Sequence, residues 1–236
     1  MVSKVYAATD IGTTRPINED SFACMESGTY VVADGMGGHV AGEVASHIFI
    51  DTVQKALSHE AKIDELVLKE VVLKANEAIL EKVSLQSEYS GMGTTATLFH
   101  ADEDVCIYAH VGDSRLYLLR GGNLIQITKD HSFVQNLLEE GKITTEEARN
   151  HPNRNMLTRA VGVEKDLEVD TGRFGIEKDD VLLLCTDGLT TVVSDEKICE
   201  ILLADTEYDK AAMLIKAAMD ADSHDNITAV VVDYHD

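Results

Sequence analysis

Aspartates recur beside glycine or asparagine where apolar runs end, in Asn18-Glu19-Asp20, Asp34-Gly35, Gly112-Asp113-Ser114, Asp187-Gly188 and Asp225-Asn226. At any single point the plain alternative is that these residue types end strands and form turns. Asp34 and Asp187, however, each follow an apolar run that predicts a buried strand. Carboxylates at the ends of core strands can converge, and their oxygens are natural ligands of Mg²⁺ and Mn²⁺. The pattern therefore predicts a site for hard divalent cations.

Other catalytic chemistries find little support. No His and Cys set has the spacing of a zinc site, and HExxH is absent. The turn DGMGGH at 34–39 is neither a dinucleotide fingerprint nor a P-loop, because Val40 stands where GxGxxG needs glycine and no Gly-Lys-Ser/Thr follows. GMGTTA at 91–96 leads into strand-like residues rather than a helix. Without a nucleophile elbow, a metal-activated water is favoured.

Arg15 lies shortly before Glu19 and Asp20. An arginine beside carboxylates often forms a plain ion pair. Beside a metal cluster, its bidentate fork can instead hold an oxyanion. The spacing leaves both roles open.

The charge balance limits the partners of this 236-residue chain. Asp and Glu number 42 against 20 Lys and Arg, which gives a net charge of −22. Such an acidic chain is not expected to bind nucleic acid or an anionic membrane face over a broad surface. With 44% apolar residues it is not expected to be disordered. Most acidic residues are expected to be solvated, and a few to face inward.

The compartment is expected to be the cytoplasm. The start MVSKVYAATD lacks the apolar core of a signal peptide, and no apolar run approaches the ~18 residues that span a bilayer. The four cysteines are scattered without a C-x-x-C pair, which favours reduced core residues.

Short β-branched runs predict strands at 4–9, 30–33, 94–99, 105–111, 116–120, 124–128, 181–185 and 227–232. Apolar stripes predict helices at 42–57 and 63–83, with two more at 195–203 and 207–221. Several strands have hairpin-length connections, which favour an antiparallel sheet with helices packed on it. The expected class is α+β, in a layered sandwich.

One domain over residues 1–236 is expected, because no linker or repeat divides the chain. Residues 132–162 fit the sandwich poorly, since they are polar, contain Pro152, and show weak helical patterns at 133–140 and 145–150. They predict a flap that leaves the sheet.

Taken together, these segments resemble the metal-dependent protein phosphatases of type 2C, the PPM family, in their compact bacterial form. The resemblance covers nearly the whole chain. The matching segments are TDIGTTRPINED at 9–20, VVADGMGGHVAGE at 31–43, GMGTTAT at 91–97, AHVGDSRLY at 109–117, KDHS at 129–132, LLLCTDGL at 182–189 and HDNITAVVV at 224–232. Each segment alone is a weak signal, but their number and order are specific. The family fold implies a four-layer α-β-β-α sandwich of two mainly antiparallel sheets flanked by helices.

The resemblance also implies roles for the candidate residues. Asp34 would bridge two Mn²⁺ or Mg²⁺ ions, and the Gly35 carbonyl would bind one of them. Asp187 and Asp225 would complete the first ion's ligands, and Asp20, with Glu19 beside it, would serve the second. Asp113 would help to bind a weaker third ion. Arg15 would hold the substrate phosphate, and residues 132–162 would be the variable flap.

Two positions depart from the family pattern. Met36 stands where animal members have a histidine that is proposed as the general acid. His39 is nearby and is a candidate acid, although a role at the helix entry is equally compatible. His224 stands where many relatives have arginine. Structural roles are expected for the other histidines, including His131.

The resemblance implies hydrolysis of phosphoserine and phosphothreonine in proteins, opposing a eukaryotic-like Ser/Thr kinase and acting on its targets. A monomer without nucleic-acid partners or membrane insertion is expected. A phosphatase-like binding module that has lost catalysis is one alternative, and the intact set of aspartates and Arg15 argues against it. A metallo-hydrolase acting on small phosphate esters is another. The acidic surface further predicts a preference for phosphosites with basic neighbours.

Overall fold

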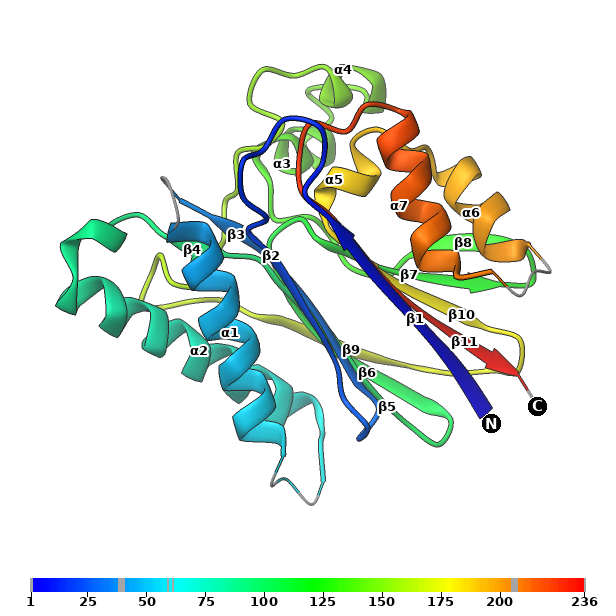
Figure 1. Cartoon of the computed structure of the whole chain (residues 1–236), viewed down its shortest axis with the longest axis horizontal. Helices are drawn as coiled ribbons and strands as arrows, with labels where there is room; N and C mark the ends of the chain where they lie inside the picture. The colour runs from blue at the N-terminus through cyan, green and yellow to red at the C-terminus, as the bar shows by residue number, and fades with distance from the viewer. Residues whose placement is uncertain (1, 38–40, 59, 61, 205–207, 236) are drawn as a thin grey trace.

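Two antiparallel sheets stack face to face, and helices cover the outer face of each (Figure 1). This is a computed structural model, and it describes residues 2–37, 41–58, 60, 62–204 and 208–235. Over these ranges the layers follow the order helices, sheet, sheet, helices. The expected α+β four-layer sandwich is therefore confirmed.

The first sheet has the strand order β2-β3-β5-β6-β9, with β4 paired to β3. Its strands are β2 (Asp20–Cys24), β3 (Thr29–Met36), β4 (Gly93–Thr94), β5 (Ala96–Asp102), β6 (Val105–Val111) and β9 (Asp170–Gly175). The predicted strand at 94–99 is interrupted at Thr95, whose hydroxyl accepts the Asp34 N–H. The strand predictions omitted β2 and β9. Both lie at sheet edges, and β9 has a polar, glycine-containing sequence.

The second sheet has the strand order β1-β11-β10-β7-β8. Its strands are β1 (Val2–Asp10), β7 (Arg115–Arg120), β8 (Asn123–Gln126), β10 (Val181–Cys185) and β11 (Ile227–His235). The two strands in the middle, β10 and β11, are buried along almost their whole length. Their near-continuous runs of apolar residues allowed both strands to be predicted from the sequence.

Helices α1 (Ala41–Leu57) and α2 (Glu65–Leu85) pack on the first sheet, as the contacts of α1 with β3 and of α2 with β6 show. The Asp64 carboxylate caps α2 by accepting the Val67 N–H. Helices α5 (Asp187–Thr190), α6 (Asp195–Leu203) and α7 (Lys210–Asp220) cover the second sheet. The predicted helix at 207–221 matches α7, although residue 207 lies outside the described residues.

Three apolar clusters hold the layers together. One lies between the first sheet and α1 with α2, and it includes the fully buried Phe49. A second lies between the other sheet and α5 to α7, and it includes Leu183. The third, which includes Phe99 and Leu182, fills the space between the two sheets. Alternate side chains of one strand, such as Leu182 and Leu183, thus serve different cores.

Residues 132–162 leave the sheets and carry α3 (Phe133–Glu139) and α4 (Thr145–Arg149), close to the predicted helical patterns. Ser132 caps α3, and Thr144 with Glu147 forms a capping box at α4. Pairing of Thr94 with Val161 joins the end of this segment to β4. Figure 1 shows α3 and α4 beyond one end of the sandwich. A short 3-10 helix (Ser87–Tyr89) follows α2.

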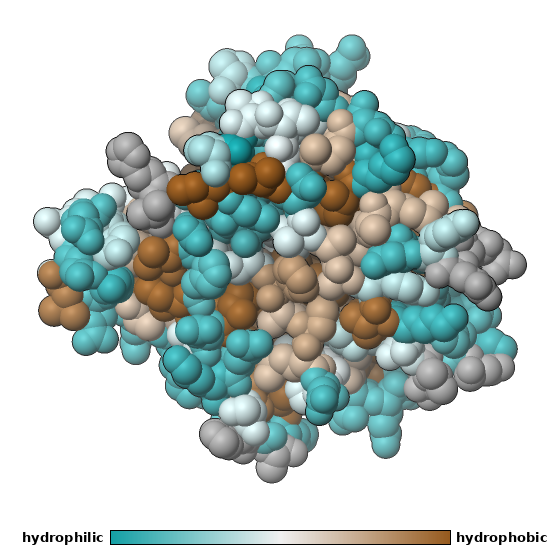
Figure 2. All heavy atoms as spheres, viewed as in Figure 1, coloured by the Kyte–Doolittle hydropathy of each residue, from teal (hydrophilic) through white to brown (hydrophobic). Residues whose placement is uncertain are grey.

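Hydrophilic residues cover much of the face seen in Figure 2, and paler and apolar residues gather over the strip where β1 and β2 run between the two helical layers. Val5 and Ile11 are among the exposed hydrophobic residues. None of the described helices is long and apolar enough to cross a membrane.

Candidate metal centre

Asp20 and Asp34 lie directly opposite each other in the antiparallel pairing of β2 with β3. One carboxylate oxygen of Asp20 accepts hydrogen bonds from the hydroxyls of Thr228 at 2.7 Å and Thr186 at 2.8 Å. Its other oxygen is buried and has no hydrogen-bond partner among the described residues. Burial raises the pKa of Asp20 to about 7, although the two hydroxyls oppose the shift.

The backbone of Asp34 is held by the turn between β4 and β5. Its N–H donates to the Thr95 hydroxyl at 2.8 Å, and its carbonyl accepts from the Thr95 N–H at 2.8 Å and from the Thr94 hydroxyl at 3.0 Å. The backbone of Asp34 is therefore fixed in place near the end of β3. Burial, followed by the charges of Asp20 and Asp187, raises the pKa of Asp34 well above its ordinary value.

Asp187 and Asp225 come from the second sheet. Asp187 is the first residue of α5, directly after β10, and Asp225 precedes β11. The Asp187 side chain lies within hydrogen-bonding reach of Asp34, and one of its oxygens is buried without a partner in the described chain. Burial and then the charge of Asp225 raise the pKa of Asp187 to about 6. The ends of two sheets thus bring these carboxylates together.

Asp113 follows β6 and lies on the wall of a cavity of about 350 Å³ that it shares with Asp187, Arg149 and Arg154. Arg149 and Arg154 belong to the 132–162 segment, so this segment covers one side of the candidate centre. Burial, followed by the charge of Asp187, raises the pKa of Asp113 well above its ordinary value. Asp113 therefore belongs to the same electrostatic group as the other aspartates.

Glu19 lies against the start of α1. Its Oε1 is buried without a partner in the described ranges, and a Cβ built on Gly42 would lie 2.4 Å from it. A Cβ on Gly35 would lie 2.1 Å from the Gly42 carbonyl oxygen. Both positions need glycine because of this close approach. Burial raises the pKa of Glu19.

Arg15 pairs with Asp225 at 2.8 Å, rather than with the nearer residues in sequence, Glu19 and Asp20. Its side chain is 45% exposed, so the guanidinium stands at the solvent side of the carboxylates. The hydrogen bond to Asp225 raises the pKa of Arg15, and the charges of Glu19 and Asp34 add to this effect. Arg15 is thus both an ion-pair partner and an accessible cation beside the cluster.

Sequence reasoning did not identify Asn226 as the side chain that joins the loops of the site. Its Oδ1 accepts the Glu19 N–H at 2.8 Å, and its Nδ2 donates to the carbonyls of Ile11 at 2.9 Å and Ile17 at 3.0 Å. Thr95, Thr186 and Thr228 were also missed as supports for aspartates. The sequence signal that could have identified these residues is a polar side chain at the end of an apolar run, because a buried polar group needs a hydrogen-bond partner.

The structure bears differently on the candidate acid His39 and on the two positions that depart from the family pattern. His39 lies outside the described residues. His224 Nδ1 lies 2.5 Å from the hydroxyl of Thr14, next to Arg15. Met36 is the last residue of β3, two positions after Asp34.

The donor set fits hard divalent cations. Three buried carboxylate oxygens lack partners within the described part of the chain, those of Glu19, Asp20 and Asp187. Carboxylates that raise one another's pKa values ionise together more readily beside a positive charge. Among the described residues, no three His, Cys, Asp or Glu side chains are placed so that they could together hold a metal ion as they stand. Mg²⁺-type sites use few carboxylates and keep several waters, so an open arrangement is compatible with them.

Comparisons with known proteins find relatives over most of the chain. The model of the family "Protein phosphatase 2C" matches residues 14–216. The chain is 41% identical to the serine/threonine protein phosphatase PstP of Mycobacterium tuberculosis, covering all of this chain and 46% of that protein. It is 39% identical to the serine/threonine phosphatase stp of Listeria monocytogenes, covering 95% of this chain and 93% of that one.

Among solved structures, the catalytic domain of PstP in complex with two manganese ions is similar, with a TM-score of 0.91, 39% identity and 99% coverage of both chains. The chain thus spans about half the length of the PstP protein, whereas it spans 93% of the Listeria relative. The family match includes the positions of Asp20, Asp34, Asp113 and Asp187 and ends before Asp225. The chain therefore belongs to the protein phosphatase 2C family.

Proposed function

We propose that this protein is a metal-dependent phosphatase that hydrolyses phosphoserine and phosphothreonine in proteins. The observation that carries the proposal is the convergence of Asp20, Asp34 and Asp187 beside the exposed Arg15, with an unpartnered buried oxygen on Asp20 and on Asp187. Family membership supports the reaction type, and the relatives' names support the class of substrate. The intact cluster also argues against a binding module without catalysis.

The proposed ligand roles follow the positions of the side chains. Asp34 would bridge two Mn²⁺ or Mg²⁺ ions, with the Gly35 carbonyl, Asp187 and Asp225 completing the first. Asp20 would serve the second, with Glu19 beside it, and Asp113 would contribute to a weaker third. The PstP catalytic domain, which binds two manganese ions, supports the two-ion core.

The chain's own groups then bind and orient the substrate. The bound ions supply positive charge against the phosphate dianion and lower the pKa of water. Arg15 has further donors besides the one that faces Asp225, and its exposed fork can hold phosphate oxygens for in-line attack. Thr186 and Thr228 hold one oxygen of Asp20, so that its other oxygen points to the cluster. His39 remains a candidate for protonating the leaving alkoxide.

We also propose how the chain is organised into domains and where in the cell it acts. Residues 1–236 would act as one catalytic domain, with a flap at about 132–162 that forms one wall of the cavity beside Asp113. The protein would work as a cytoplasmic monomer on phosphorylated proteins, including the targets of a eukaryotic-like Ser/Thr kinase and the kinase itself. The net charge of −22 supports the absence of nucleic-acid partners.

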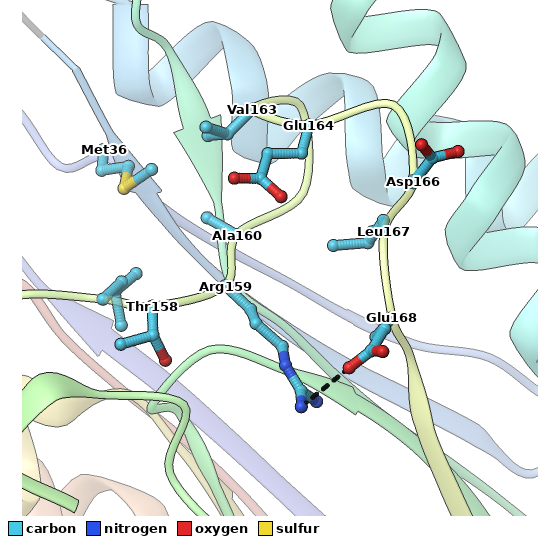
Figure 3. A pocket seen from close by; sticks show the side chains of 10 residues that line it. Met36, Thr158, Arg159, Ala160, Val163, Glu164, Asp166, Leu167 and Glu168 are labelled. Carbon is cyan, nitrogen blue, oxygen red and sulfur yellow. Dashed lines mark ion pairs between the residues drawn. The ribbon is translucent and has the colours of Figure 1, made fainter. Parts of the chain in front are cut away.

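Phosphosites with basic neighbours would be preferred. A pocket of about 400 Å³ adjoins the end of β3, and Figure 3 shows Met36 on one side of it and the loop that carries Glu164, Asp166 and Glu168 on the other. Glu168 pairs with Arg159 at 3.0 Å, whereas the exposed Glu164 and Asp166 carboxylates form no ion pair within the described ranges. A basic side chain next to the phosphoresidue could rest its stem on Met36 and Leu167.

The direct test is hydrolysis of p-nitrophenyl phosphate by the purified protein with Mn²⁺. Activity should disappear with EDTA and in Asp34→Ala, and should persist in Asp51→Ala, which removes an exposed carboxylate from α1. No hydrolysis with Mn²⁺, or equal hydrolysis by Asp34→Ala, would overturn the proposal. A phosphothreonine peptide then separates a protein phosphatase from a hydrolase of small phosphate esters.

A further inference from the structure

His131 holds both backbone polar groups of Gly112, the residue before Asp113. The His131 N–H donates to the Gly112 carbonyl at 2.7 Å, and the Gly112 N–H donates to Nδ1 of the His131 ring at 3.1 Å. The imidazole is 5% exposed. A buried amide that loses such an acceptor has no water to replace it.

The turn at Gly112 leaves few alternative conformations. Gly112 has φ +111°, and a Cβ at this position would lie 2.6 Å from the Thr95 side chain. On the other side of Asp113, the Ser114 hydroxyl lies 2.7 Å from the Thr95 hydroxyl, which also accepts the Asp34 N–H. Asp113 is therefore placed relative to Asp34 by two anchored neighbours.

The contacts also determine the tautomer of His131. Because Nδ1 accepts the Gly112 N–H, the ring proton is assigned to Nε2, which faces Asp170 at 3.2 Å and also lies 3.2 Å from the Arg159 guanidinium. Arg159 pairs with the other oxygen of Asp170 at 2.9 Å. Burial lowers the pKa of His131, and the neighbouring ring of His110 lies 4.8 Å away.

We propose that His131 is a positioning residue that, through Gly112, fixes the carboxylate of Asp113 for metal binding. This rests on the proposed function, because it requires Asp113 to be a metal ligand. The chain from Arg159 through Asp170 and His131 to Gly112 also ties the end of the flap to this ligand. Residues that orient ligands commonly affect metal affinity 10- to 100-fold.

Two substitutions test the roles of the two ring nitrogens of His131 separately. His131→Asn places an oxygen near the position of Nδ1 and loses the contact with Asp170. His131→Gln places its amide near the position of Nε2 and loses the acceptor for the Gly112 N–H. Isothermal titration with Mn²⁺ should show that His131→Gln weakens the Asp113-dependent site by about 10-fold or more, whereas His131→Asn stays within about 2-fold. A histidine that only stabilises the fold would not make His131→Gln weaken Mn²⁺ binding more than His131→Asn.

Asp113→Asn identifies which Mn²⁺ site depends on Asp113. If this variant binds Mn²⁺ as the wild type does, both the ligand assignment and the positioning role fail. If it loses a site that His131→Gln retains, only the positioning role fails. Circular dichroism in EDTA controls for folding. If His131→Gln does not fold, imidazole ¹⁵N NMR of the wild type tests the positioning role instead. A proton on Nδ1 would overturn that role, and a proton on Nε2 alone would support it.

Discussion

Asp20 and Asp34 are Cα partners across the β2–β3 ladder, so the buried carboxylate of Asp20 and the half-buried carboxylate of Asp34 lie side by side on one sheet. Like charges directly opposite each other destabilise a sheet. Asp187 reaches the same place from the second sheet. This concentration of carboxylates should cost folding stability when no cation is bound. The first two predictions test that relationship.

Removing one of these charges should stabilise the metal-free protein and abolish its activity. In EDTA, Asp34→Asn should raise the Tm by about 2–6 °C, because a buried carboxylate repelled by Asp20 and Asp187 becomes neutral. With Mn²⁺, phosphatase activity should fall by about 100-fold or more. Differential scanning fluorimetry and a p-nitrophenyl phosphate assay measure the two effects. A lower Tm in EDTA would show that the carboxylates do not strain the fold.

The metal-free protein should lose stability as the pH rises. Folding raises the pKa of Asp187 to about 6 and that of Asp20 to about 7. A carboxyl whose pKa is higher in the folded state stabilises the protein below its unfolded pKa of about 4, and this stabilisation is lost as the pH rises through the folded value. The Tm in EDTA should therefore fall between about pH 5 and pH 8.

The stabilisation by Mn²⁺ should grow over the same pH interval, because protons compete less for the ligand oxygens. Melting curves with and without Mn²⁺ at several pH values give the comparison. A Tm in EDTA that is flat or rises with pH would contradict the prediction.

Arg15 should act on the substrate rather than on the metals. Arg15→Ala should lower kcat/KM for a phosphothreonine peptide by about 10- to 100-fold, and Arg15→Lys should recover only part of it, because lysine lacks the bidentate fork. Mn²⁺ affinity should change little. Arg173→Ala, which removes an exposed arginine from β9, is the matched control. A large loss of Mn²⁺ affinity in Arg15→Ala would assign Arg15 to the ligand cluster instead.

Asn226 should matter for stability as well as for the site. Asn226→Ala removes an acceptor for Glu19 and two donors to Ile11 and Ile17. Leaving these backbone groups unpaired should lower the free energy of unfolding by about 2–4 kcal/mol, as measured by urea denaturation. Asn123→Ala, at the exposed start of β8 with one weak 3.4 Å side-chain contact, should change it by under about 1 kcal/mol. Equal effects of the two substitutions would refute this role.

Glu164 and Asp166 should contribute to the choice of substrate. The double variant Glu164→Gln with Asp166→Asn should reduce the preference for phosphothreonine peptides with arginine flanks over glutamate flanks by about 5-fold at low salt. Glu26→Gln, in the turn at the far end of the β2–β3 hairpin, should leave the ratio unchanged. Faster turnover of acidic-flanked peptides by the wild type would contradict the charge argument.

Much of the fold was predictable where burial is strong. The central strands β10 and β11 and the amphipathic helix α1 show their apolar patterns in the sequence, because both faces of a strand or one stripe of a helix must be buried. The edge strands β2 and β9 were missed. Their burial comes from neighbours rather than from their own composition, so no local pattern reveals them.

The sequence by itself determined which aspartates end the core strands, the acidic balance of the chain, and membership of a phosphatase family. Only the tertiary structure decided which groups meet. Arg15 pairs with Asp225 across 210 positions of sequence, and His131 holds a turn that lies 19 positions earlier. The physical reason is that hydrogen bonds and ion pairs depend on distance and direction, which arise when two sheets close over a shared core. Spacing along the chain does not carry that information.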